Sequence, residues 1–144
     1  MFDKLLKALL VPAPLADSDA RTALAALLVR VARTDHMYAA EEVERIDAIL
    51  MVRYNLSSFE AAALRAAGEA MESEAPDTIR FTRALKDAVP LEERTALATA
   101  LWSVAIADGQ RDGGEDQMLR LIVNLLGLSD VESGLARQRA QASF

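Results

Sequence analysis

The chain has 144 residues, of which 52% are hydrophobic but only 5% aromatic, and its formal net charge is −6 at pH 7. This length is enough for one domain with a sizeable core, and the scarcity of aromatic residues favours packed helices over a β-sandwich. The negative charge argues against a nucleic-acid-binding domain, which needs a basic face, and the absence of cysteine excludes disulfides, thiolate metal sites and cysteine nucleophiles.

The first segment, residues 1–11, predicts a short amphipathic helix. Its apolar run is interrupted by Asp3, Lys4 and Lys7, so it does not match a signal peptide. No stretch of the sequence approaches the ~20 apolar residues that span a bilayer. We expect this helix to pack on the domain, with peripheral membrane contact as the alternative.

Apolar residues at helical spacing, with start and stop signals between them, predict the rest of the chain as further helices. Their expected ranges are about 17–34, 40–54, 57–72, 76–89, 90–107, 115–126 and 129–144. Strand patterns with a period of two are absent. The sequence therefore predicts an all-α fold, a single helical domain of about seven helices spanning residues 1–144.

Local signals fix several helix ends. Ser57–Glu60 and Ser129–Glu132 each have the pattern of a capping box, in which serine and glutamate side chains satisfy free amides at a helix start. Asn55 and Gly127 suit the left-handed position that ends a helix.

Side chains at helical spacing also predict the core. Phe59, Phe81 and Trp102 fall among apolar residues at this spacing, and we interpret them as core residues rather than as part of a cofactor site. Ala25 and Ala26 would let a neighbouring helix approach closely. No organic cofactor is expected.

The chain contains an internal repeat. Leu28–Val31 matches Leu101–Val104 at an offset of 73 positions, and Leu56–Glu60 matches Leu128–Glu132 at an offset of 72. Each copy consists of a helix, an acidic corner, a second helix, a capping box and a third helix. Residues 24–64 and 97–137 are therefore predicted to be related halves of one domain.

Each acidic corner has an Asp at the end of one predicted helix and a Glu seven positions later, in the first turn of the next. An Asp at a helix C-terminus faces the negative end of the helix dipole, and a cation or a loop amide would relieve that repulsion. Ca²⁺, Mg²⁺ and Mn²⁺ prefer such oxygen ligands. The sequence thus predicts a divalent-cation site with the ligands Asp35, Glu42, Asp108 and Glu115, and with Glu41, Asp112 and Asp116 as second choices.

Helix capping is the alternative explanation of these carboxylates. Asp112 and Glu115 also have capping-box spacing. The EF-hand pattern fails, because the third position counted from Asp108 is Gln110 and the twelfth is Leu119.

The first corner departs further from a ligand pattern than the second. It has His36 where the second has Gly109, and Ala39 where the second has Asp112. His36 is the only histidine, and no nucleophile or orienting group stands at a recognisable spacing from it. We therefore assign no catalytic residue and expect no enzymatic activity.

The corners resemble the tellurite-resistance TerB-like family. The residues that carry the resemblance are Ala105–Gly109 followed by Glu115, with Leu125–Ser129 downstream, and in the first half Ala32–Asp35 followed by Glu41, Glu42 and Ile46. The resemblance covers roughly residues 24–132. It implies an all-helical bacterial protein associated with resistance to tellurite and other stresses and with proposed divalent metal binding, and related domains occur beside the J-domains of co-chaperones.

These observations lead to a ranked set of functions. The first is a non-enzymatic divalent-cation-binding or interaction module in a cytoplasmic bacterial stress response. The second is a protein-interaction or co-chaperone-type scaffold without metal, which could contact a membrane surface through residues 1–11. The third is a metal-dependent hydrolase that uses the same carboxylates. A protein partner is expected in the first two cases, and nucleic acid in none.

Overall fold

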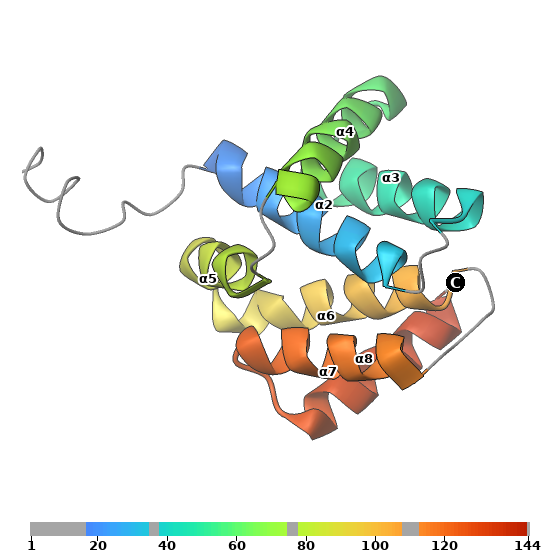
Figure 1. The fold of residues 1–144 in the computed structure, drawn as a ribbon. Coiled ribbons are helices and arrows are strands. Elements are labelled where there is room, and N and C mark those ends of the chain that lie inside the picture. The colour runs from blue at the N-terminus through green and yellow to red at the C-terminus, as the bar shows by residue number, and fades with distance from the viewer. Residues whose placement is uncertain (1–16, 35–37, 75–77, 108–112, 144) are drawn as a thin grey trace, which may run out of the picture.

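The computed structural model describes residues 17–34, 38–74, 78–107 and 113–143 (Figure 1). Over these residues the chain forms seven helices and no strand, which confirms the predicted all-α class. The helices are α2 (Asp17–Arg33), α3 (Ala40–Tyr54), α4 (Ser58–Glu74), α5 (Thr78–Ala88), α6 (Leu91–Ala105), α7 (Gly113–Leu125) and α8 (Asp130–Ser143). The helix predicted over residues 1–11 lies outside the described residues. None of the described helices is both long and apolar enough to cross a membrane.

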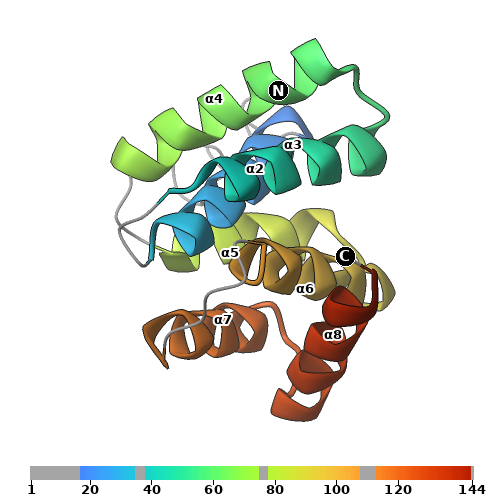
Figure 2. The same cartoon turned by 90° about the vertical axis from the view of Figure 1, so that its right-hand side faces the viewer.

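The helices pack around α2. Figures 1 and 2 show α3 and α4 above α2, and α6, α7 and α8 below it. Helix α5 lies next to the start of α6 (Figure 1). Within the first predicted half α2 packs most extensively on α4, and within the second half α6 packs most extensively on α8. In each predicted half, the first and third helices thus pack mainly on each other.

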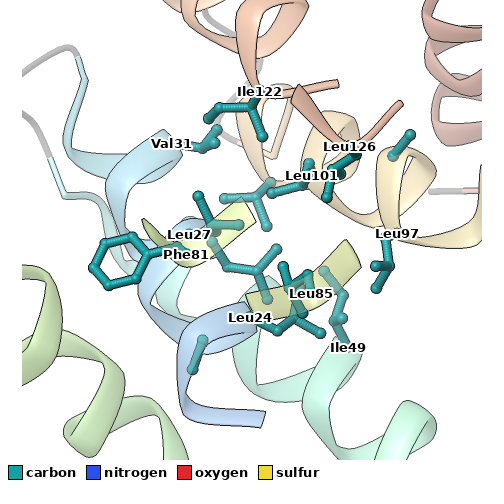
Figure 3. Packing of buried hydrophobic residues seen from close by; sticks show 14 of the residues in the cluster. Leu24, Leu27, Val31, Ile49, Phe81, Leu85, Leu97, Leu101, Ile122 and Leu126 are labelled. Atoms are coloured by element: carbon teal, nitrogen blue, oxygen red, sulfur yellow. The ribbon is translucent and has the colours of Figure 1, made fainter. Parts of the chain in front are cut away.

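The core follows from the sequence of α2. The residues from Ala23 to Val29 are all fully buried, so neighbours cover this helix on every side. Every described helix contributes apolar side chains to this core, and Figure 3 labels ten of them. The labelled members are Leu24, Leu27 and Val31 of α2, Ile49 of α3, Phe81 and Leu85 of α5, Leu97 and Leu101 of α6, and Ile122 and Leu126 of α7.

The predicted helix ends are confirmed where they are described. Each capping box has both of its hydrogen bonds. The Ser57 amide donates to Glu60 Oε1 over 3.0 Å and the Glu60 amide donates to Ser57 Oγ over 3.1 Å, and the Ser129 and Glu132 pair repeats this at 3.0 and 3.2 Å. Asn55 and Gly127 have φ angles of 52° and 88°, the left-handed conformation expected at these ends.

One core prediction is wrong. Phe81 and Trp102 are buried, but Phe59 is 83% exposed. The buried side chains of α4 include Ala61, and a residue two positions away points to nearly the opposite side of a helix because each residue turns it by ~100°. Phe59 therefore faces solvent.

Candidate cation site at the acidic corners

The described residues that flank the two acidic corners lie on the same side of the molecule. The end of α2, the start of α3, the end of α6 and the start of α7 are all on the right in Figure 1, the side that faces the viewer in Figure 2. A hydrogen bond joins the two sets, because Arg45 Nη1 of α3 donates to the Ser103 carbonyl oxygen of α6 over 3.0 Å. The start of α3 therefore lies against the end of α6.

Glu42 is the described member of the first predicted ligand pair. Its side chain is fully buried, and its Oε1 accepts a hydrogen bond from the backbone amide of Ala39 over 3.0 Å. Ala39 has no side-chain oxygen to complete a capping box. A buried carboxylate is costly unless hydrogen bonds or a positive charge compensate it, and the bond from the Ala39 amide is one such contribution.

The other predicted ligands are described in part or not at all. Glu41 is exposed in the first turn of α3, and Asp116 is partly buried near the start of α7. Glu115 is the third residue of α7, and its side chain lies outside the description, as do Asp35, Asp108 and Asp112. Among the side chains that are described, no three of the metal-ligating types come together. The four-carboxylate site stays a prediction.

Arg45 provides a positive charge beside the first corner. It lies three residues after Glu42 on α3, and side chains at this spacing are neighbours on a helix. Burial lowers the pKa of the Arg45 guanidinium, but an arginine stays protonated at neutral pH. Arg45 is thus a protonated residue on the turn of α3 that follows Glu42, and it is bound to the Ser103 carbonyl. Its spacing from Glu42 can be read from the sequence, but its contact with Ser103 cannot.

A second polar cluster joins the first corner to α4. Tyr38 lies within the first corner, and the Arg33 guanidinium lies 5.1 Å from the centre of its ring. Burial and the nearby Glu69 carboxylate raise the pKa of the Tyr38 hydroxyl. Arg65 of α4 donates to Asp47 Oδ1 of α3 over 2.6 Å. These contacts hold the described part of the first corner against α4, and the Arg65–Asp47 pair joins α4 to α3.

Two arginines of α2 extend this polar contact. Arg33 Nη1 lies 2.7 Å from Glu72 Oε2, and Arg30 Nε lies 3.5 Å from Glu72 Oε1. Arg30 also donates to Thr78 Oγ1 over 2.8 Å, which ties α2 to the first residue of α5. Their spacing of three on α2 indicates a shared face, but no sequence rule identifies a partner about forty positions away.

The described surface also has an apolar groove between α3 and α6, with a volume of ≈ 350 Å³. None of the predicted cation ligands lines it. The lining residues are Ala48, Ile49, Val52 and Arg53 of α3 and Ala96, Leu97 and Ala100 of α6. The hypothesis of a protein-interaction scaffold predicts an exposed apolar groove of this kind.

The family model described as tellurite resistance protein TerB matches residues 21–138, which include both acidic corners. No match was found among curated proteins, and none among solved structures. The matched range covers most of the 144 residues and agrees with the resemblance seen in the sequence, so the chain belongs to the TerB family.

Proposed function

We propose that this TerB-family domain is a non-enzymatic module that binds a divalent cation at its acidic corners and acts in a cytoplasmic stress response of the bacterial tellurite-resistance kind. Asp35 and Glu42 would be the ligands from the first corner, and Asp108 and Glu115 those from the second. The cation would supply positive charge where the carboxylates gather, and the protein would present this metal-stabilised surface to a partner protein.

The full burial of Glu42 is the observation that supports this proposal most directly. Its bond from the Ala39 amide is compatible with a ligand role, because metal-binding carboxylates usually accept hydrogen bonds from the surrounding protein. Carboxylate oxygens together with loop carbonyls suit a hard cation such as Ca²⁺, Mg²⁺ or Mn²⁺. The chemistry of these donors therefore supports the choice of a hard cation.

Proximity of the corner flanks is the second support. The bond from Arg45 to Ser103 holds the start of α3 against the end of α6. A cation bound at either corner would then stabilise contacts between the two halves as well as one loop.

The test is thermal unfolding of the metal-stripped protein with and without millimolar Ca²⁺, Mg²⁺ or Mn²⁺. A cation that binds only the folded protein raises the melting temperature by mass action. At a cation concentration 100 times its Kd, the free energy of unfolding increases by about 2.7 kcal/mol. We expect one of the three ions to raise it. The double variants Asp35→Asn/Glu42→Gln and Asp108→Asn/Glu115→Gln should each reduce this cation-induced shift.

The matched control is Glu60→Gln/Glu132→Gln, which changes the two glutamates of the capping boxes. This variant can be less stable, but its cation-induced shift should equal that of the wild type. If none of the three ions shifts the melting temperature of the wild type, the corners are helix caps and the proposal fails.

A partner-binding scaffold without metal is the second candidate, and Arg45 favours it. The Arg45 guanidinium, three residues after Glu42 on α3, would supply near the first corner the positive charge that the first candidate assigns to a metal, and the α3–α6 groove offers an apolar surface for a protein. In this case the three ions leave the melting temperature unchanged, while Arg45→Met lowers it with or without them.

A further inference from the structure

The α3–α6 groove is apolar, open and lined by small side chains. Leu97 is fully buried and Ile49 is 9% exposed, so they form its floor, whereas Val52 at its edge is 85% exposed. Ala48, Ala96 and Ala100 leave room above this floor. An exposed valine beside alanines of two helices is the kind of surface that accepts the apolar face of another helix.

The groove continues beyond α6. A second hollow, of ≈ 470 Å³, lies between α6 and α8 and is lined by Thr95, Ala96 and Thr99 with Arg139 and Ala142. Ala96 lines both hollows. The surface therefore crosses α6 from α3 to α8, and its α3 side is the more apolar.

The sequence contains a segment that suits this groove. Residues 2–11 place apolar side chains at the positions i, i+3, i+4, i+7 and i+8 of a helix, with Lys4 and Lys7 on another face. The apolar residues are Phe2, Leu5, Leu6, Leu9 and Leu10. A helix this short is marginal in water on its own, so it needs a surface that buries this face.

The beginning of α2 lies next to the groove. The guanidinium of Arg21, in the second turn of α2, lies 4.6 Å from the centre of the Tyr54 ring, and that of Arg53 lies 5.8 Å from the same ring. Arg53 itself lines the groove. Tyr54 thus connects the start of α2 to the edge of the groove.

The intervening residues make the groove reachable. The five residues 12–16 separate the segment from α2 and can span up to ~17 Å when extended, and Pro12 and Pro14 limit their freedom. A short tether of this kind gives an effective concentration in the millimolar range. Binding by the chain's own segment is therefore favoured over binding by a second copy at ordinary protein concentrations.

We infer that residues 2–11 form a helix whose apolar face occupies the α3–α6 groove of the same chain. This inference does not depend on cation binding, because the groove shares no residue with the predicted cation site. It assigns the amphipathic segment an intramolecular role in place of membrane contact, and the groove an occupant other than an outside protein.

The absence of cysteine from the chain allows a direct test by disulfide trapping in the full-length protein. The two test pairs are Leu9→Cys with Val52→Cys, and Leu6→Cys with Ala48→Cys. The control pair is Leu9→Cys with Val131→Cys, at a 73%-exposed position near the start of α8. Val52, Ala48 and Val131 are exposed, so these changes should leave the fold intact, and circular dichroism checks this.

Under mild oxidation at least one test pair should form an intramolecular disulfide at least about tenfold faster than the control pair, because of the effective concentration of a seated segment. Adding Ala96→Trp, which fills the point shared by the two hollows, should remove this difference. The inference is overturned if both test pairs react at the control rate, if the product is a disulfide-linked dimer, or if Ala96→Trp leaves the reaction unchanged. A dimer would make a second copy the occupant.

Discussion

Gly68 of α4 lies directly against Ala25 of α2. A Cβ atom added to Gly68 would be 2.6 Å from the Ala25 Cβ and 2.8 Å from the Ala25 carbonyl carbon. Separations this short do not occur between unstrained atoms, and one of the two groups belongs to the backbone. Only glycine at position 68 lets α4 pack on α2 at this distance.

Gly68→Ala should therefore destabilise the protein, although alanine is the better helix former. The added methyl forces the two helices apart, and overpacking of this kind costs about 1–3 kcal/mol. The free energy of unfolding from urea titration, with a parallel melting curve, measures the effect.

Gly134→Ala is the matched control. Gly134 lies inside α8 with open space around its missing side chain, so the substitution should stabilise the protein by about 0.5–1 kcal/mol. Equal effects at positions 68 and 134 would show that α2 and α4 are not in close contact at Gly68.

The bond between Trp102 and Ser133 gives a second prediction. Trp102 Nε1 donates to Ser133 Oγ over 3.1 Å, and both side chains are buried, so the bond ties α6 to α8. Ser133→Ala leaves the indole N–H without this acceptor, and an unsatisfied buried donor costs about 1–3 kcal/mol. Ser58→Ala, at an exposed position of α4, is the control. Urea unfolding followed by Trp102 fluorescence should show a lower midpoint for the first variant only.

Arg45 gives a third prediction. The Ser103 carbonyl lies in the last turn of α6, where helix carbonyls lack intrahelical partners, and Arg45 donates to it. Arg45→Met keeps much of the side-chain length but removes this donor, which should lower stability by about 1–3 kcal/mol. Arg80→Met, at an exposed position of α5, should change it little. If both variants melt alike, the contact between α3 and the end of α6 does not depend on Arg45.

The sequence predicted the features that depend on local chemistry. The capping boxes at Ser57 and Ser129 involve groups three residues apart, and the left-handed ends at Asn55 and Gly127 depend on a single residue. The helix ranges follow from apolar spacing in the same way. All of these were visible because their physical cause lies within one or two helical turns.

The features that the sequence did not predict depend on which helices meet. Phe59 is exposed because of the side of α4 that faces α2. Arg45 reaches Ser103 across fifty-eight positions, and no spacing rule connects them. The candidate cation site is intermediate, because the sequence identified Glu42 but neither its full burial nor the contact of the nearby Arg45 with Ser103.

The capping glutamate of α4 gives the final prediction, which concerns pH. Hydrogen bonds from the Ser57 backbone amide and hydroxyl lower the pKa of the Glu60 carboxyl. Because the folded-state pKa lies below the unfolded value of about 4.3, ionised Glu60 stabilises the fold above that pH, and the stabilisation is lost as the pH falls through the folded-state pKa. Glu60→Gln keeps an oxygen acceptor but not the charge. Its melting temperature should therefore be lower than that of the wild type at pH 7, and this difference should shrink towards pH 3. Melting curves across this range check it, with the exposed Glu44→Gln of α3 as control. If the difference in melting temperature does not change with pH, the negative charge of Glu60 does not contribute to stability.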